Sequence, residues 1–163
     1  MAKSEQLPRL IALLREHRWA AMATIGDEGR AEASMVAYVL DEKLNAVYLH
    51  LSQLAAHSRN LQGHPDASLV ISETDTGEGD PQQLARATLY GRASLLLQGE
   101  QGYEEARRCY LQRLPTAEPL FDFADFRLYR FAIHKARFVG GFAQAHSYTV
   151  DELGEALLAS EKG

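Results

Sequence analysis

The sequence predicts a mainly β fold, an antiparallel sheet or barrel with a few flanking helices. After the N-terminal helical pattern, several strand-like runs follow one another before the next long helical pattern begins. Short loops at 26–29 and 41–45 join the first three of these runs, as in a meander of hairpins. Helical patterns connect or flank the strands rather than alternate with them, which disfavours a doubly wound α/β fold.

The N-terminal half is expected to contain two helices and three strands. Apolar residues at helical spacing predict a first helix that ends near His17, with Pro8 in its first turn. The run 19–25 is apolar and is typical of a buried strand, and further strands are expected at 31–40 and 46–51. A short helix over 52–63 follows, with Ser52 as its N-cap.

The C-terminal half is expected to add further strands and two helices. Strands are predicted at 67–72, 85–97, 126–134 and 136–139, with a polar hairpin loop at 73–83 and a loop at 115–125. Gly91 marks a bulge or a close approach of another backbone. A helical stripe covers 103–114, and Thr149 with Glu152 forms a capping box for an amphipathic helix over 150–160.

Length and composition describe one ordinary globular domain spanning 1–163. The chain is 46% hydrophobic and 24% charged, and its net charge of −5 argues against nucleic-acid binding. It has no long apolar run for a membrane span and no signal-peptide pattern, so we expect a cytoplasmic protein without a membrane partner. Its single cysteine, Cys109, excludes an internal disulfide and is expected to be a buried thiol.

The stretch from His57 to Asn60 predicts an anion site. It follows the strand 46–51 at a strand-to-helix turn, where backbone amides and the helix dipole favour a phosphate, and Arg59 adds a planar fork for phosphate oxygens. Ser34, Ser52 and Arg86 also lie on or beside strands. In a closed meander these groups would line one cleft, whereas the alternative for each is a solvated polar residue.

The sequence gives little support for a metal site, a nucleophilic active site or a nucleotide-binding loop. His50, His57 and His64 recur every seven residues but lack the cysteine or acidic partners of a metal site. The chain has no nucleophile elbow and no glycine-rich nucleotide loop. Gly140 and Gly141, between Phe138 and Phe142, are read either as a β-turn beside core aromatics or as a close approach to a bulky ligand.

The order of elements and five segments resemble one known family. The chain is similar to FMN-binding split-barrel proteins related to pyridoxamine 5′-phosphate oxidase, and most of all to the branch that contains haem-utilisation proteins. The likeness covers about 9–151 and rests on the segments 33–38, 48–52, 57–61, 86–93 and 136–142.

This resemblance implies a six-stranded antiparallel split barrel that forms a homodimer, with cofactor sites at the interface built from both chains. Ser34, Met35 and Val36 would flank the flavin ring. The segment with His57 would hold the FMN phosphate through Ser52, Ser58 and Arg59, and Arg86 would lie near the flavin in the same chain or the partner. Tyr38 or Ala37 stands where the oxidase has a basic residue, and Asn60 follows Arg59.

Three functions follow as hypotheses. The preferred one is an FMN-dependent oxidoreductase that acts on a small-molecule substrate or electron donor, with the flavin carrying the chemistry. The second is a haem-binding protein on the same fold, with His134 and His146 as candidate ligands. The third is a non-catalytic binding module with an apolar patch around the terminal helix.

Overall fold

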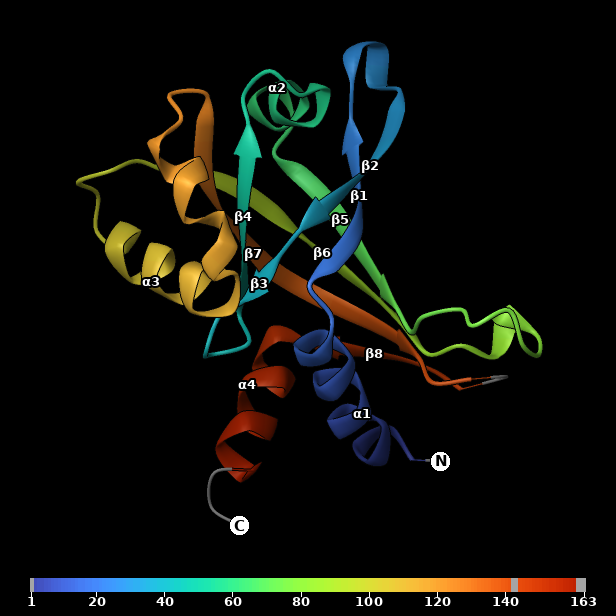
Figure 1. Cartoon of the computed structure of the whole chain (residues 1–163). Coiled ribbons are helices and arrows are strands. Elements are labelled where there is room, and N and C mark those ends of the chain that lie inside the picture. The colour runs from blue at the N-terminus through green and yellow to red at the C-terminus, as the bar shows by residue number, and fades with distance from the viewer. Residues whose placement is uncertain (1, 142–143, 161–163) are drawn as a thin grey trace.

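The computed structural model describes residues 2–141 and 144–160 and shows a curled antiparallel sheet with helices at both ends and along one side (Figure 1). The helices are α1 (Lys3–Glu16), α2 (Ala56–Gly63), α3 (Tyr103–Arg113) and α4 (Val150–Ser160). Three short 3₁₀ segments are η1 (Asp27–Gly29), η2 (Pro81–Gln83) and η3 (Pro115–Asp122). The strands are β1 (Trp19–Ile25), β2 (Ala31–Ala37), β3 (Val39–Leu40), β4 (Ala46–Ser52), β5 (Asp66–Ser72), β6 (Arg86–Leu96), β7 (Phe126–Val139) and β8 (Ala145–Thr149).

The strands follow the order β2-β1-β5-β6-β7-β4-β3, and β8 pairs with β7 outside this path. Only Tyr38 separates β2 from β3, so the two ends of the path belong to one interrupted strand and the sheet curls into a barrel. If β2 and β3 are counted together and β8 is set aside, the barrel has six strands. The predicted split barrel is therefore confirmed, as is the hairpin order of the first three strands.

The predicted strand 31–40 is interrupted because its two parts pair with different neighbours. β2 pairs with β1, whereas β3 pairs with β4. At the break, the Tyr38 backbone N–H donates to the Arg18 carbonyl and the Tyr38 hydroxyl donates to the Leu14 carbonyl at 2.8 Å. Tyr38 is 1% exposed, so it fixes the point where the chain passes from one side of the barrel to the other.

The two strands predicted at 126–134 and 136–139 are one continuous strand, β7, with a bulge. Tyr90 of β6 pairs with Lys135 and Gly91 pairs with Ile133, which leaves His134 as the extra residue. The bulge predicted at Gly91 is confirmed. A Cβ atom there would lie 2.1 Å from the Ala132 carbonyl oxygen, so the backbones approach too closely for any side chain.

The structure differs from three further expectations about local structure and adds one strand. Helix α1 begins at Lys3, which puts Pro8 in its second turn, and α2 begins at Ala56 with Ala55 as N-cap, so Ser52 instead ends β4. The loop expected at 115–125 contains η3, and the strand β8 was not predicted. The hairpin between β7 and β8 passes through Gly140, whose N–H donates to the Gln144 carbonyl; Phe142 lies outside the described residues.

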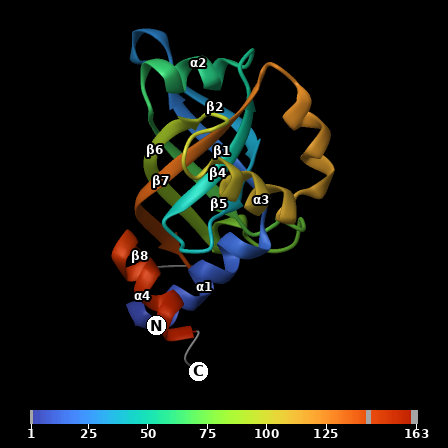
Figure 2. The same ribbon diagram turned by 90° about the vertical axis from the view of Figure 1, so that its left-hand side faces the viewer.

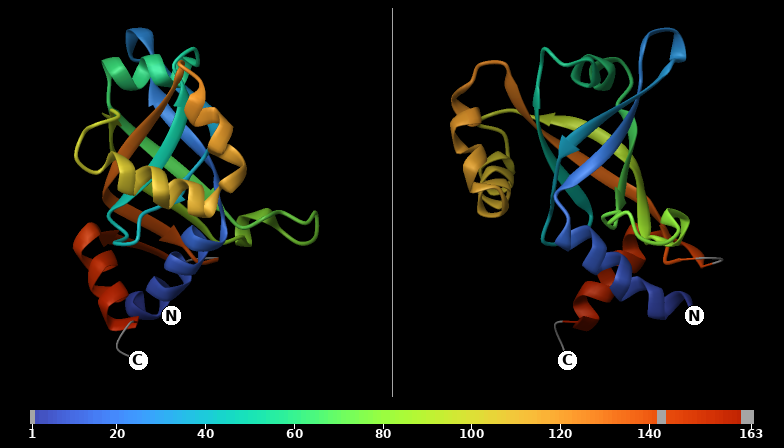
Figure 3. Two further views of the ribbon diagram at one scale, coloured as in Figure 1. Left: turned by 60° about the vertical axis from the view of Figure 1, so that its left-hand side comes forward. Right: turned by 45° about the vertical axis from the view of Figure 1, so that its right-hand side comes forward.

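Two apolar clusters hold the fold together. The larger one fills the barrel interior and extends to α1 and α4, and its fully buried members include Leu10, Met22, Leu49, Leu69 and Phe131. The smaller one lies on the outer side of β3, β4 and β7, where α3 and η3 cover the sheet (Figure 2; Figure 3, left). Every residue of β4 from Ala46 to Leu51 is buried because side chains on both of its faces are covered.

The terminal helix α4 packs beside α1 below the barrel (Figure 1). Leu153 is 1% exposed within the main cluster, and Lys3 forms a 2.5 Å ion pair with Glu152. The predicted capping box is confirmed, because the Thr149 N–H donates to the Glu152 carboxylate and the Glu152 N–H donates to the Thr149 hydroxyl. Among the described residues, no helix is long and apolar enough to cross a membrane.

Candidate functional site

Helix α2 lies across one end of the barrel and forms a polar cluster with the β1–β2 hairpin. The Ser34 hydroxyl lies 3.0 Å from His57 Nδ1. The Asn60 side-chain amide donates to the Thr24 hydroxyl at 3.0 Å and to the Glu32 carboxylate at 2.8 Å. We call this group of five residues the mouth cluster, because it occupies the end of the barrel between β2 and α2.

Within the mouth cluster, His57 has a buried side-chain atom that lacks a hydrogen-bond partner among the described residues. Its Nε2 is buried and has no hydrogen-bond partner within the described part of the chain. Burial lowers the pKa of His57, so the imidazole is neutral at neutral pH. A neutral imidazole offers one donor and one acceptor, and here only Nδ1 has found a partner.

The three predicted phosphate-binding residues lie beside this cluster, but each already has a partner within the chain. The Ser52 hydroxyl donates to the Asp125 carboxylate at 2.8 Å, and the Ser58 hydroxyl donates to the Ser52 carbonyl at 2.7 Å. Arg59 is exposed and its Nη1 donates to the Leu54 carbonyl at 2.7 Å. These bonds hold the turn between β4 and α2, and they leave the rest of the Arg59 guanidinium for an anion.

The remaining predicted site residues are distributed over other parts of the barrel. Val36 is 3% exposed and belongs to the interior, whereas Met35 is 48% exposed on the outside. Arg86 begins β6 and its Nη1 donates to the carbonyls of Gln82 and Leu84. The structure therefore brings Ser34, Ser52, His57, Ser58 and Arg59 together around α2.

Arg86 lies at the other end of the barrel, so the expected single cleft is not formed within one chain. The strand register decides this point. Arg86 pairs with Val139, at the end of β7 opposite to Phe126, which pairs with Ser52. Barrel order and register are set by pairing between distant segments, and a local sequence pattern does not contain them.

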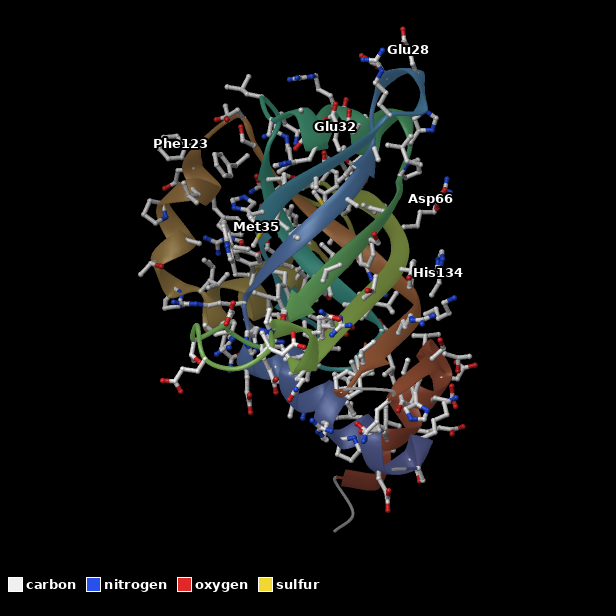
Figure 4. All side chains as sticks on the ribbon, turned by 90° about the vertical axis from the view of Figure 1, so that its right-hand side faces the viewer. Glu28, Glu32, Met35, Asp66, Phe123 and His134 are labelled. Atoms are coloured by element: carbon white, nitrogen blue, oxygen red, sulfur yellow. The ribbon has the colours of Figure 1, made fainter. Side chains whose placement is uncertain are left out.

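The outer face of β1, β2, β5 and β6 is a feature that the sequence prediction missed. β1 was expected to be buried, but its residues alternate between the interior and the outside. Figure 4 views this side and shows no helix in front of the sheet. We call the following outward-facing residues the bare face: Trp19, Ala21, Ala23, Ile25, Ala33, Met35, Ser68, Val70, Thr88 and Tyr90.

The bare face is apolar at its centre and charged at its borders. Trp19 is 56% exposed and Tyr90 is 39% exposed. Along β7, Arg137 pairs with Thr88 and Lys135 pairs with Tyr90, and the Lys135 ammonium lies 5.0 Å from the centre of the Tyr90 ring. A soluble monomer seldom exposes such a continuous apolar surface, so this face is a candidate binding surface.

The two candidate haem ligands differ in exposure. His134 is the exposed bulge residue of β7 and points outward (Figure 4). His146 is half-buried and pairs with Phe138, which is fully buried. Residues directly opposite each other in an antiparallel pair share one face, so His146 is on the inner side of β7 and His134 is not.

His50 has a structural environment that its seven-residue spacing did not indicate. Its ring stacks on Phe121 with centres 3.9 Å apart, and it lies edge-on to Tyr110. Burial lowers the pKa of His50 to about 4, so the ring behaves as a neutral aromatic at neutral pH. Among the described residues, no group of three or more His, Cys, Asp or Glu side chains is arranged to hold a metal ion.

Known proteins with similar sequences include haem oxygenases. Haem oxygenase HutZ of Vibrio cholerae is 24% identical over 147 residues, which are 90% of this chain and 82% of that protein. The non-canonical chloroplastic haem oxygenase HOZ of Arabidopsis thaliana is 33% identical over 120 residues, which are 72% of this chain but only 34% of that protein.

Solved structures with the same fold include a haem-binding protein and a protein of the pyridoxinephosphate oxidase family. A haem-binding protein of Mycobacterium smegmatis superposes with a TM-score of 0.80 at 29% identity, over 95% of this chain and 61% of that chain. A Clostridium acetobutylicum protein of the pyridoxinephosphate oxidase family superposes with a TM-score of 0.71 at 14% identity, over 93% of this chain and 99% of that chain, which shows a likeness of fold alone.

The family follows from a match that covers most of the chain. Residues 11–153 match the model of the family described as CREG, beta-barrel. This range begins in α1, contains the whole barrel and ends in α4. The chain therefore belongs to the CREG β-barrel family, a group of split barrels.

Proposed function

We propose that this chain binds haem. The observation that carries the proposal is its similarity to the V. cholerae haem oxygenase, which extends over 90% of this chain and 82% of the relative. The A. thaliana relative, at 33% identity, supports the same ligand. Bound haem would supply an iron centre, while the residues of this chain bind it, orient it and limit its contact with water.

The bare face is the surface that fits haem best. Haem is a flat and mostly apolar ring with two propionate groups at one edge. The bare face offers an apolar centre with Trp19, Met35 and Tyr90 exposed. Lys135 and Arg137 adjoin it along β7 and are suited to pair with carboxylates.

We propose His134 rather than His146 as the iron ligand from this chain. His134 is exposed at a bulge beside the bare face, and a bulge commonly re-aims a side chain next to a functional site. His146 would first have to leave its position opposite Phe138. A neutral imidazole is a common proximal ligand of haem iron.

We also propose that a second copy of the chain covers the bare face in a homodimer, so that haem is held between the two copies. A two-fold interface uses the same patch on both subunits, and small residues such as Ala21 and Ala23 permit close approach of two sheets. The hairpin tip of η1 carries Asp27 and Glu28, with charge opposite to that of Lys135 and Arg137. In such a pair, Arg86 of the partner subunit could approach the mouth cluster, which Arg86 cannot reach within one chain.

The test of haem binding is a titration of the purified protein with haemin, followed by the Soret band. We expect saturable binding in the wild-type protein, a shifted and weakened band in His134→Ala, and wild-type behaviour in His146→Ala and in the control His64→Ala. Absence of a saturable Soret change in the wild-type protein would contradict haem binding. A loss confined to His146→Ala would instead contradict our choice of ligand.

FMN is the second candidate, and the mouth cluster is the observation that favours it. The unpartnered His57 Nε2 and the fold shared with a pyridoxinephosphate oxidase family protein support a flavin near β2 and α2. The fit to the phosphate is partial, because the hydroxyls of Ser52 and Ser58 are already bonded within the chain. An FMN-dependent oxidoreductase would therefore depend on Arg59 for its firmest phosphate contact.

A titration with FMN followed by flavin fluorescence tests this second candidate. Arg59→Ala should lower FMN affinity about tenfold or more, because a charge-assisted hydrogen bond contributes roughly 1.5–3 kcal/mol. Arg30→Ala is the matched control, because Arg30 is an exposed arginine on the β1–β2 hairpin whose guanidinium pairs with Glu28. FMN affinity that is the same in Arg59→Ala and wild type would show that the phosphate lies elsewhere, and no uptake by the wild type would exclude FMN.

A further inference from the structure

A polar cavity of about 250 Å³ lies between the β3–β4 turn, the start of α3 and β7. It lies on the outer side of the barrel that α3 covers, across the barrel from the bare face. It shares no residue with the mouth cluster. Its walls include Asp41, Asn45, Tyr48, Glu105 and Arg130. The cavity is smaller than the pockets of roughly 300–1,000 Å³ that hold drug-sized ligands, so it suits a small metabolite.

Tyr48 is the most informative residue of this cavity. It is 8% exposed and packs in the cluster with Val39 and Leu128. Its hydroxyl makes no hydrogen bond to any residue that the structure describes. Among the described residues, the buried side-chain atoms without a partner belong to His50 and His57, so the Tyr48 hydroxyl is open to the cavity that Tyr48 lines. The fold itself does not depend on this hydroxyl. The hydroxyl is therefore available to a ligand.

The surroundings of Tyr48 supply further donors. Arg130 Nη2 donates to the Asn45 side-chain carbonyl at 2.9 Å, and the other guanidinium N–H groups are available in the cavity wall. Helix α3 begins after Gly102 without a side-chain cap, and the Tyr103 N–H donates to the Glu100 carbonyl, so the amides of Glu104 and Glu105 are left for a ligand. Burial and the nearby Asp41 raise the pKa of Tyr48, so its hydroxyl stays protonated and donates.

The charged groups of the cavity are balanced. Its wall carries three carboxylates and three cations: Asp41, Glu42, Glu105, Lys43, Arg108 and Arg130. Glu42 pairs with Arg108 at 3.9 Å, and Asp41 Oδ1 accepts from the backbone N–H groups of Asn45 and Ala46. Glu105 and the second Asp41 oxygen are left to meet a positive group, and Arg130 and Lys43 are left to meet a negative one. A small molecule that carries both charges matches this wall better than a simple anion or a simple cation.

We propose that this cavity binds a free α-amino acid. Its carboxylate would accept hydrogen bonds from Tyr48, Arg130 and the first turn of α3, and its ammonium group would face the carboxylates of the wall. The site is independent of the haem proposal, because neither its residues nor its side of the barrel belong to the bare face.

Calorimetric titration of the full chain with each of the twenty common L-amino acids tests this proposal. Acetate, methylamine and inorganic phosphate serve as probes that carry only one of the two charges. We expect at least one amino acid to bind more tightly than all three single-charge probes. Tyr48→Phe should weaken that amino acid about tenfold, since it removes one hydrogen bond to a charged group.

Two controls keep the test decisive. Tyr48→Phe should melt at the wild-type temperature, because the hydroxyl it removes has no partner in the fold. Tyr110→Phe is the same substitution in the same apolar cluster, at a residue that does not line the cavity, and should bind the amino acid as the wild type does. The proposal is overturned if no amino acid binds, if acetate or phosphate binds as tightly, or if Tyr48→Phe binds with unchanged affinity.

Discussion

The two outer sides of this barrel differ in what covers them, and β4 and β1 show the difference most clearly. β4 is buried along its length because the interior covers one of its faces and α3 with η3 covers the other (Figure 2). β1 has the same interior on one face but no covering element on the other, so its exposed and buried residues alternate (Figure 4).

The covered side of the sheet contributes to the stability of the single chain, whereas the bare side is left for binding. On the covered side, Tyr110 and Phe121 enclose His50 in an aromatic cluster that the chain completes by itself. On the bare side, Trp19 and Met35 remain about half exposed. Apolar surface that the chain does not bury remains available to a ligand or to a second copy, which is the basis of both proposals for the bare face.

The largest effect is expected from shortening a tyrosine on the covered side. Tyr110→Ala should lower the free energy of unfolding by about 3–5 kcal/mol, as for other large buried aromatic residues, because Tyr110 is 3% exposed. Tyr90→Ala, the same change on the bare face, should lower it by about 1 kcal/mol or less in the monomer. Urea unfolding of both variants in dilute solution measures this difference, and equal losses would contradict the distinction between the two sides.

A smaller effect is expected from pH, again on the covered side. The pKa of His50 is about 4 in the folded chain, whereas the ordinary pKa of a histidine is 6.5. Between these two pH values the His50 ring is protonated in the unfolded chain but not in the folded chain, so protonation favours unfolding. Stability should therefore fall as the pH falls from 6.5 toward 4, by roughly 2–3 kcal/mol for this residue. His50→Phe keeps an aromatic ring beside Phe121 and should flatten this slope. The slope that remains is due in part to His57, whose pKa burial also lowers. A slope unchanged in His50→Phe would show that His50 is not a buried neutral ring.

The bare side should respond in assembly rather than in the stability of the single chain. Met35→Glu places a charge at the centre of the proposed dimer interface, where an unpaired charge is costly to bury. We expect this variant to sediment as a monomer at concentrations where the wild type is a dimer. Gln112→Glu adds the same charge to exposed α3 on the covered side and should sediment as the wild type does. A wild-type protein that is itself monomeric would contradict the homodimer.

The features that the sequence predicted correctly have local causes. The turn at Gly26–Gly29, the bulge at Gly91 and the Thr149–Glu152 capping box each depend on residues close together in the chain or on a glycine requirement. The family resemblance supplied the strand count and the closure of the barrel, which periodicity alone did not.

The features that the sequence did not predict depend on distant pairing. β8 forms only because β7 offers it an edge, and the break at Tyr38 arises from contacts with Arg18 and Leu14. The two sides of β1 are both apolar, with Met22 inside and Trp19 outside, so alternation could not reveal the bare face. The predicted phosphate residues Ser52, Ser58 and Arg59 do lie together around α2, whereas the register places Arg86, which was expected to share their cleft, at the other end of the barrel.

The most direct test of the central claim, that haem binds on the bare face, is to compare haemin affinity in Met35→Glu and Gln112→Glu. The two variants add the same charge to the two sides of the barrel. We predict that Met35→Glu loses most of its haemin affinity, while Gln112→Glu keeps the wild-type Soret titration. Equal haemin affinity in Met35→Glu and wild type would contradict a haem site on the bare face.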